Sequence, residues 1–366
     1  MGKYSKERSR ENYRKDKLSS KSKSSNDHFN IAIKSLDRLC IEQFNVESFD
    51  VVIVDVLKMS VEQRDDEIVG IIQEWVNLLA KTKLFVTIKG ELSAINKYLK
   101  YRKIRVEFND EIEFPQNLQE ERYALNLDEI RIILNDVKFK QKGYYLCLIS
   151  SGCRPIEVLG LKKKDYFWSG KKYGALIPAA LTKKKIARTI FFSEECTPFL
   201  GTLLKQHEDE QTIFTKNKNL RNARTSEDSI LHKHLEKLGM DYKFETTGNN
   251  KINLYCFRGY FFTKAIKIFN EDIAHAMIGH GAYLQQYQRR NQKEKEELFD
   301  EMEGEILVYD LSKKDDEIKK LKFANNMISQ QNEKIDNMER KMEEDRELAK
   351  KRDKLINEFL LYNKHE

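Results

Sequence analysis

Apolar residues recur at every third or fourth position through much of the first hundred residues, which is the spacing of one face of an amphipathic helix. The clearest run contains Ile68, Ile71, Ile72, Trp75, Leu78 and Leu79. This pattern predicts a small all-helical domain over residues 28–103. Residues 1–27 instead repeat Lys, Arg and Ser with almost no large apolar side chain. They predict a disordered basic tail, because so little apolar surface does not offset the entropy lost on ordering.

The regular spacing stops over residues 104–119, which contain Pro115. Because the residue before a proline favours extended backbone, we expect an interdomain linker there. Helical patterns resume over residues 120–300 and predict a second domain. In that domain Asn126 is placed to cap one helix, and Pro155 is placed to begin another.

Two short runs in the second domain are rich in strand-forming residues, Ala175–Ile177 and Arg188–Phe192. They flank residues 182–185, so the pattern predicts a β-hairpin with lysines at its tip. The polar stretch 217–228 predicts a surface loop, and a helix is expected over 230–238. The expected fold class is therefore mainly α with a small β-hairpin or sheet.

The last part of the chain, residues 301–366, is highly charged. Apolar positions recur there every seven residues, at Leu321, Ile328, Ile335, Met342, Ala349 and Ile356. This repeat predicts a long amphipathic helix with one apolar seam and one half-polar seam. A coiled coil with a partner or a second copy is favoured, and docking on the protein's own surface remains the alternative.

Composition narrows the class of protein without fixing it. A net charge of +7 permits a polyanionic partner. The five cysteines are scattered without a Cys-x-x-Cys pair, so neither a disulfide framework nor a zinc site is expected, and a reducing compartment fits best. No apolar run approaches the length of a membrane span, which predicts a soluble protein with no membrane partner.

One compact stretch, Leu254–Tyr287, holds most of the candidate chemistry. Arg258 is expected at the start of an apolar helix. A second helix, residues 271–278, ends at a glycine, so His280 begins a new turn, and His275 is expected to pack within that helix. A forked cation, an imidazole and a phenol form a set for phosphoryl transfer that needs no metal ion.

Four motifs occur in order along the second domain. They are made by Gly152, Arg154 and Glu157; by Thr182, Lys183, Arg188 and Ile190; by Tyr255 and Arg258; and by Ile278, Gly279 and His280. Together they resemble the tyrosine recombinase (phage-type integrase) family, and most closely the archaeal integrases. The resemblance implies a helical core-binding domain followed by a mixed α/β catalytic domain. Two departures are Tyr255, where the family has His or Lys, and a short interval from His280 to Tyr287.

The resemblance also implies roles for the matched side chains. Arg154 and Arg258 would grip the nonbridging oxygens of a DNA phosphate and offset charge in the transition state. Lys183 would protonate the departing 5′-hydroxyl, and Lys184 or Lys185 could substitute for it.

The remaining candidates act on or near the attacking phenol. His280 would donate a hydrogen bond to the phosphate or accept the proton of the phenol. Tyr287 would be the nucleophile that forms a 3′-phosphotyrosine, with Tyr283 as its rival. Glu157 would support the helix of the first arginine, and Tyr255 is open between a phosphate contact and packing.

The function implied by the resemblance is site-specific DNA recombination, for integration or excision of a mobile element. The implied partner is double-stranded DNA, held by a tetramer on paired sites without a cofactor, in the cytoplasm of a prokaryotic cell, and a viral or plasmid origin is compatible. Candidate DNA contacts, for which a solvated helix face is the alternative, are Lys97, Lys100, Arg102, Lys103, Lys184 and Lys185. Two other functions remain open, a type IB topoisomerase and a catalytically inactive DNA-binding accessory protein.

Overall fold

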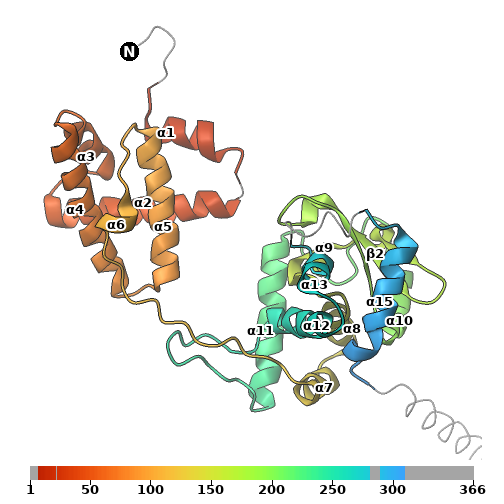
Figure 1. Ribbon diagram of the computed structural model, residues 1–366. Coiled ribbons are helices and arrows are strands. Elements are labelled where there is room, and N and C mark those ends of the chain that lie inside the picture. Colours follow the sequence, from red (N-terminus) through yellow and green to blue (C-terminus); the bar gives the residue numbers. More distant parts are fainter. Residues whose placement is uncertain (1–6, 22, 281–288, 310–366) are drawn as a thin grey trace, which may run out of the picture. The chain divides into compact units, whose positions relative to one another are not determined.

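The computed structural model describes residues 7–21, 23–280 and 289–309. The contacts divide the chain into two compact units (Figure 1). Unit 1 comprises Met1–Arg122 with Lys243–Asn249, and unit 2 comprises Tyr123–Tyr242 with Asn250–Glu366. The described residues are mostly helical with one three-stranded antiparallel sheet, which confirms the expected fold class.

The regular elements of unit 1 in its described part are all helices, joined by irregular backbone. Its elements are α1 (Arg10–Tyr13), the π-helix η1 (Arg14–Leu18), α2 (Lys23–Phe44), α3 (Phe49–Val56), α4 (Val61–Ala80), α5 (Phe85–Tyr101) and α6 (Phe108–Glu111). The helices α2 and α5 pack against each other and bury Phe29 and Tyr98, whose rings meet edge to face at 5.4 Å. Trp75 of α4 is also fully buried and donates its indole N–H to Ser35 at 3.1 Å.

Over the described residues 7–21 and 23–27, the structure corrects the expectation of a disordered tail over residues 1–27. Helical turns occupy residues 10–18, and Tyr13 is buried with its ring 5.0 Å from that of Phe29. Arg10 binds Asp37 at 2.7 Å and Asp50 at 2.6 Å, so charged residues also hold this segment. A few anchoring contacts therefore order a stretch whose composition alone predicts disorder.

The expected linker over residues 104–119 also begins later than the sequence pattern indicates. Ile104, Val106, Phe108 and Ile112 are buried in the core of unit 1. Buried and exposed residues alternate over residues 104–108 without forming a strand, so this burial does not continue the helical spacing of the preceding domain.

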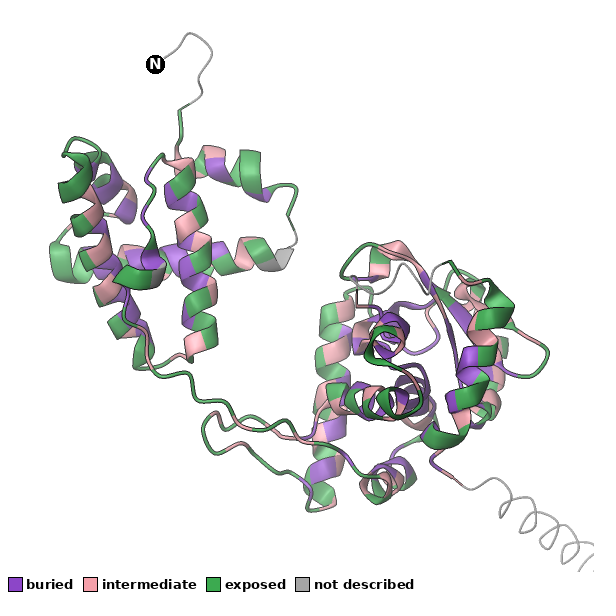
Figure 2. Ribbon diagram, in the orientation of Figure 1, coloured by how far each residue is buried: buried purple, intermediate pink, exposed green. Residues whose placement is uncertain are grey.

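Unit 2 is built from helices and one small sheet, with the helices α8 and α12 at its centre. Its helices are α7 (Leu127–Asp136), α8 (Phe139–Ser151), α9 (Pro155–Gly160), α10 (Thr197–Lys205), α11 (Leu220–Lys237), α12 (Leu254–Ile268), α13 (Glu271–Met277) and α15 (Gln292–Ile306). Short 3₁₀ turns are η2 (Lys163–Asp165), η3 (Ala179–Leu181) and η4 (Glu194–Cys196). Contacts of α12 with both α8 and α15 make it the centre of the unit, and Figure 2 shows its inward face and α8 buried.

The sheet has the order β1 (Tyr166–Trp168), β2 (Tyr173–Ile177) and β3 (Arg188–Phe191). Both pairings are antiparallel, and Ile177 of β2 faces Arg188 of β3. The hairpin of the sequence analysis is thus present, with a third strand added at its edge. Residues 178–187 join β2 to β3, and this long connection carries the lysines.

Three local expectations are met by observed caps. The Asn126 side chain accepts a hydrogen bond from the Glu129 N–H at 2.9 Å, and Pro155 is the first residue of α9. The turn after α13 places Gly279 at φ +78°, in the left-handed region that favours glycine.

Two local expectations are wrong. The predicted loop 217–228 is helical from Leu220, because Asn219 caps α11 and Ala223, Glu227 and Leu231 form one buried line at four-residue spacing. Arg258 does not open its helix, since α12 begins at Leu254 and Arg258 lies in the second turn. Of the C-terminal helix predicted over residues 301–366, residues 301–306 are the end of α15, which stops at Ile306. The rest of that prediction, over residues 310–366, lies outside the described residues.

The helix α15 is fastened to the rest of unit 2 by buried polar contacts. Lys172 of the β1–β2 connection binds Asp300 at 2.6 Å and also binds Glu303. Beyond the helix, Glu195 accepts the backbone N–H groups of Val308 at 2.9 Å and Tyr309 at 2.6 Å. These contacts fix both the middle and the end of α15.

Candidate functional site

The first arginine of the cluster stands at the turn between α8 and α9. Gly152 ends α8 at φ +58°, and Arg154 is the extended residue that precedes α9. Glu157 reaches back to this turn and accepts from the Arg154 backbone N–H and from Arg154 Nη1, both at 2.9 Å. Glu157 is fully buried, whereas the Arg154 side chain stays 18% exposed, so its guanidinium reaches the surface of the unit.

A second arginine, Arg188 of β3, binds the same Glu157 carboxylate from the interior of unit 2. Its side chain is 1% exposed, and its Nη2 lies 2.7 Å from Glu157 Oε2 and 3.6 Å from Cys153 Sγ. Burial alone would raise the pKa of Glu157, but Arg188 and Arg154 hold it below its ordinary value. Burial would lower the pKa of Arg188, yet Cys153 and Glu157 raise it above its ordinary value.

The sequence places Arg188 in a motif with Thr182, Lys183 and Ile190 but indicates no role for its side chain. Its only signal in the sequence is a cation at the start of an expected strand, two residues before the apolar Ile190. The same pattern is typical of an exposed residue at the end of a strand. Only the ion pair with the buried Glu157 shows that the Arg188 side chain faces inward. The structure therefore adds Arg188 to the site as the residue that holds Glu157 in place.

The third arginine, Arg258, arrives from the second turn of α12. Its Nη1 donates to the carbonyl of Gly152 at 2.7 Å, which joins α12 to the turn that carries Arg154. Arg258 is 8% exposed, and among the residues the structure describes no carboxylate lies within 4.0 Å of its guanidinium. Burial, and then repulsion from Arg154, lowers the pKa of Arg258 to about 10.

His280 follows the turn that ends α13, which Ile278 and Gly279 form. Gly279 brings this turn so close to Arg188 that a methyl group on Gly279 would lie 2.7 Å from the guanidinium carbon. His280 Nδ1 lies 2.7 Å from Nδ1 of His275, and the two rings stack at 4.7 Å. Burial lowers the pKa of His280 to about 4, helped by the charges of Arg258, His275, Arg154 and Arg188, so this imidazole is neutral at pH 7.

These contacts place four of the motif side chains, Arg154, Arg188, Arg258 and His280, around one point of unit 2. Two guanidinium groups bind the carboxylate of Glu157 and a third, that of Arg258, lies nearby without a carboxylate of its own, which leaves an excess of two positive charges in a partly buried site. The arrangement offers several N–H donors and little to neutralise them. It suits an anion with oxygens on several sides, such as a phosphate.

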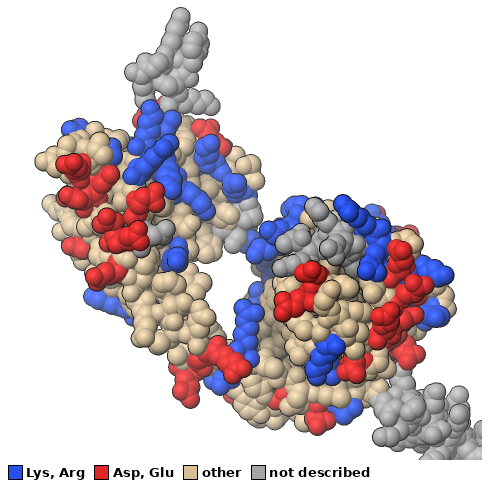
Figure 3. All heavy atoms as spheres, viewed as in Figure 1, with Lys and Arg blue, Asp and Glu red and all other residues tan. Residues whose placement is uncertain are grey.

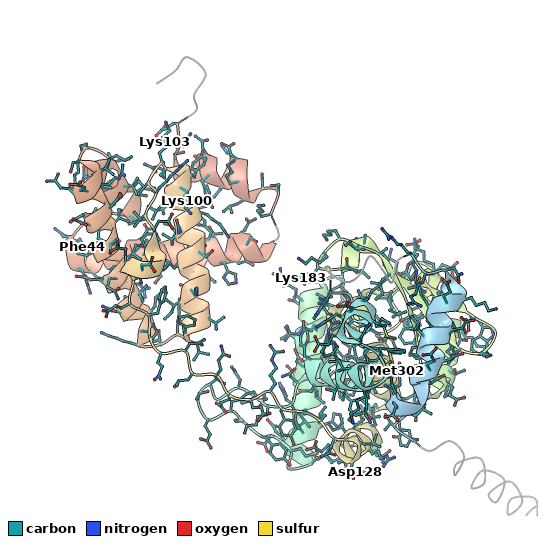
Figure 4. The ribbon with its side chains drawn as sticks, viewed as in Figure 1. Phe44, Lys100, Lys103, Asp128, Lys183 and Met302 are labelled. Carbon is teal, nitrogen blue, oxygen red and sulfur yellow. The ribbon has the colours of Figure 1, made fainter. Side chains whose placement is uncertain are left out.

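The lysines of the β2–β3 connection lie outside this cluster. Lys183, Lys184 and Lys185 are exposed, and Figure 4 shows Lys183 at the surface of unit 2. Lys185 takes a positive φ of 58° and donates to the Ala180 carbonyl at 3.0 Å. Within the described part of the chain, no hydrogen bond or ion pair joins Lys183 to an arginine-cluster residue.

Tyr255 faces another part of the unit. It is 44% exposed, and its ring lies 5.8 Å from the guanidinium carbon of Arg224, which in turn pairs with Asp228 at 2.7 Å. The structure thus places Tyr255 against α11 and not in hydrogen-bonding contact with the arginines. The two candidate nucleophiles, Tyr283 and Tyr287, lie outside the described residues.

In unit 1, the basic candidates divide into two kinds. Lys97, Lys100 and Lys103 are exposed, and Figure 4 shows Lys100 and Lys103 near the C-terminal end of α5. Arg102 instead binds Asp50 at 2.9 Å and Tyr98 at 3.0 Å, so its charge is already partnered inside the unit. Figure 3 shows Lys and Arg side chains gathered on one part of unit 1, beside a separate acidic group.

Metal clusters and membrane-spanning helices are both absent from the part of the chain that the structure describes. There, no three His, Cys, Asp or Glu residues are grouped to hold a metal ion. No helix among these residues is both long and apolar enough to cross a membrane.

No protein-family model and no curated protein matches the chain. Among solved structures, it is similar to the XerH site-specific recombinase bound to difH substrate, with 16% identity and a TM-score of 0.44 over 63% of this chain and 69% of that one. The chain is also similar to the Tn1549 transposon integrase in complex with transposon right end DNA, with 14% identity and a TM-score of 0.47 over 73% of this chain and 97% of that one. A third similar structure is the integrase from mycobacterium phage Brujita, with 15% identity and a TM-score of 0.40 over 80% of this chain and 91% of that one. With TM-scores below 0.5, none of these similarities by itself establishes a shared fold.

Proposed function

We propose that the arginine cluster of unit 2 binds a backbone phosphate of DNA, and that the protein is a site-specific recombinase or integrase. The observation that carries this proposal is Arg258, a buried guanidinium that lies beside Arg154 and whose pKa is lowered to about 10. A buried cation next to another cation is costly unless an anion joins them. A phosphate between Arg154 and Arg258 would remove both the repulsion and the lack of a counter-charge.

The same geometry suits the transition state of phosphoryl transfer. Attack on a phosphodiester increases the negative charge on its nonbridging oxygens. Guanidinium groups that donate two hydrogen bonds therefore stabilise the transition state more strongly than they stabilise the ground state. Arg154 is held by Glu157 and Arg258 by the Gly152 carbonyl, so neither side chain has to be ordered when DNA binds. This preorganisation is what lowers a barrier, because little reorientation remains to be done.

Proton transfer in the proposed reaction needs a neutral base and a cationic acid. His280 is neutral at pH 7 because its pKa is lowered to about 4, so it has a lone pair for the proton of an attacking phenol. Lys183, on the connection that leads into β3, protonates the departing 5′-oxygen. Tyr287 is the nucleophile, and the 3′-phosphotyrosine keeps the bond energy so that a second strand can rejoin without ATP.

The proposed partner is duplex DNA, bound by four protomers on paired sites during integration or excision of a mobile element. Lys97, Lys100 and Lys103 of unit 1 would contact backbone phosphates outside the catalytic position, because they are exposed. Such contacts release counterions, so binding should weaken as salt concentration rises.

A nicked suicide duplex tests the proposal, because loss of the fragment beyond the nick traps the covalent intermediate. The wild-type protein should form a denaturant-resistant adduct, and Tyr287→Phe should abolish it. Tyr283→Phe is the matched control and should form the adduct normally. Arg258→Lys should bind DNA yet form little adduct, since a lysine does not reproduce the fork.

An inactive DNA-binding accessory protein is the second candidate, favoured by the position of Tyr255. That side chain lies against Arg224, and the arginine cluster therefore has no polar group from this motif position. Salt-sensitive duplex binding without an adduct on any nicked substrate would support this function and reject the recombinase.

A further inference from the structure

We propose that His275 acts through His280, as a positioning residue that fixes its tautomer and as the acceptor of the proton that His280 takes up. The inference rests on the proposed function, because it concerns the proton of the attacking phenol. His275 lies in the last turn of α13, five residues before His280, and its sequence context alone predicts only a packing role.

The contact between the two rings restricts where their protons lie. The Nδ1 atoms are 2.7 Å apart, which is a hydrogen-bond distance. Two lone pairs or two N–H groups at this distance would repel each other, so one Nδ1 carries a proton and the other accepts it. The tautomer of His280 is therefore set jointly with that of His275.

The surrounding charges decide which ring donates. The groups that lower the pKa of His280 are Arg258 of α12, Arg154 of the α8–α9 turn, Arg188 of β3 and His275 itself. Beside three cations, a lone pair on His280 Nε2 is favoured over an N–H group. His280 therefore carries its proton on Nδ1 and donates it to His275.

This arrangement solves a difficulty in the proposed reaction. If His280 alone accepted the phenol proton, a full positive charge would form next to Arg258 and Arg154, where its pKa of about 4 shows that charge is disfavoured. In the relay, the phenol proton moves to His280 Nε2 while the Nδ1 proton of His280 moves to His275 Nδ1. The oxygen of the phenol forms the new bond to phosphorus, His280 ends neutral, and the charge appears on His275.

The position of His275 is suitable for this task. It is only partly buried, so a charged form keeps some hydration. Phe262 of α12 packs against its ring at 4.7 Å, which holds the imidazole in register with His280. The backbone adds a second tie, because the N–H of His280 donates to the carbonyl of His275 at 2.9 Å.

Two variants test the relay by rate, and the tautomer of His280 then tests the positioning role separately. His275→Gln keeps a side-chain oxygen that accepts from His280 Nδ1, but it takes up no proton. His275→Phe keeps the stacked ring and loses both functions. We expect both variants to bind nicked duplex within about 2-fold of wild type and to form adduct roughly 10-fold to 100-fold more slowly. A wild-type rate in His275→Gln would overturn the relay.

The pH profile and the tautomer give readouts that a purely structural role would not move. His275→Phe should shift the acid limb of adduct formation to higher pH, because His275 helps to lower the pKa of His280. In the full-length protein labelled with ¹⁵N-histidine, NMR should show His280 protonated at Nδ1 in wild type and in His275→Gln. The opposite tautomer in wild type would overturn the proposal. This measurement needs no DNA, so it remains decisive even if the protein forms no adduct and the proposed function fails.

Discussion

Glu157→Gln is the most direct test of how the site is held together. The substitution preserves the size of the side chain but removes the carboxylate that Arg154 and Arg188 share. Glu157 is fully buried, and Arg188 is 1% exposed, so water replaces little of the lost interaction. The amide also turns N–H donors toward guanidinium N–H groups, which is a repulsive contact.

The expected magnitude follows from this burial. Breaking a buried ion pair from one side costs about 3–5 kcal/mol, which is a large share of the roughly 5–15 kcal/mol that stabilises a domain. With a urea slope near 3 kcal/mol per molar, the unfolding midpoint of unit 2 should fall by about 1–2 M. Unit 1 has its own core and should be unchanged.

Hydrogen exchange followed by mass spectrometry across a urea series measures the two units in one sample. Peptides from α8, α9 and α12 should lose protection in Glu157→Gln, whereas peptides from α2 and α5 serve as the internal reference. Glu210→Gln is the matched control, because Glu210 is 66% exposed and its ion-pair partners among the described residues are the surface lysines Lys162 and Lys164. A loss in unit 2 no larger than in this control would refute the assignment of Glu157 as the shared counter-charge.

An added anion gives the same experiment a second arm. Without Glu157 the three arginines have a larger excess of positive charge, so inorganic phosphate should bind the variant more tightly than wild type. Binding to the folded state alone raises stability with ligand concentration. Phosphate should therefore recover more stability in Glu157→Gln than in Glu210→Gln, and equal recovery would contradict an anion site at the arginines.

Other substitutions and conditions test separate parts of the description. Gly279→Ala should destabilise unit 2 by about 1–2 kcal/mol or more in urea unfolding, because φ is +78° and the new methyl group meets Arg188 at 2.7 Å. Arg102→Ala should lower the unfolding midpoint of unit 1, whereas Lys100→Ala should leave it unchanged and reduce the salt dependence of duplex binding. Lowering the pH from about 6.5 to about 4 should destabilise wild type, since only unfolded His280 takes up a proton in that window. His280→Asn should show a smaller loss between the same two pH values.

Local sequence signals predicted the parts of the fold that depend on neighbouring residues. Asn126, Pro155 and Gly279 each act through one turn of backbone, so their roles could be read from the order of residues. Tyr13 is held in place by its contact with the ring of Phe29. The polar composition of residues 1–27 does not reveal this contact, and for that reason it predicted disorder.

The sequence predicted which residues belong to the site better than it predicted which of them contact one another. Arg154, Arg258 and His280 stood in recognisable motifs, and the structure brings them together. That Arg188 reaches the same carboxylate, or that His275 meets His280, depends on how β3 and α13 approach α9, which no spacing along the chain encodes. Likewise, the inward position of Arg102 becomes visible only with Asp50 beside it.

The sharing of one carboxylate by Arg154 and Arg188 has a consequence for how substitutions combine. Once Glu157 is gone, neither arginine has its buried partner, so removing either of them then relieves repulsion. Double substitutions across this triad should be less harmful than the sum of the single ones, with coupling energies of about 0.5–3 kcal/mol. Genetic variation at any one of the three positions is therefore constrained by the side chains present at the other two.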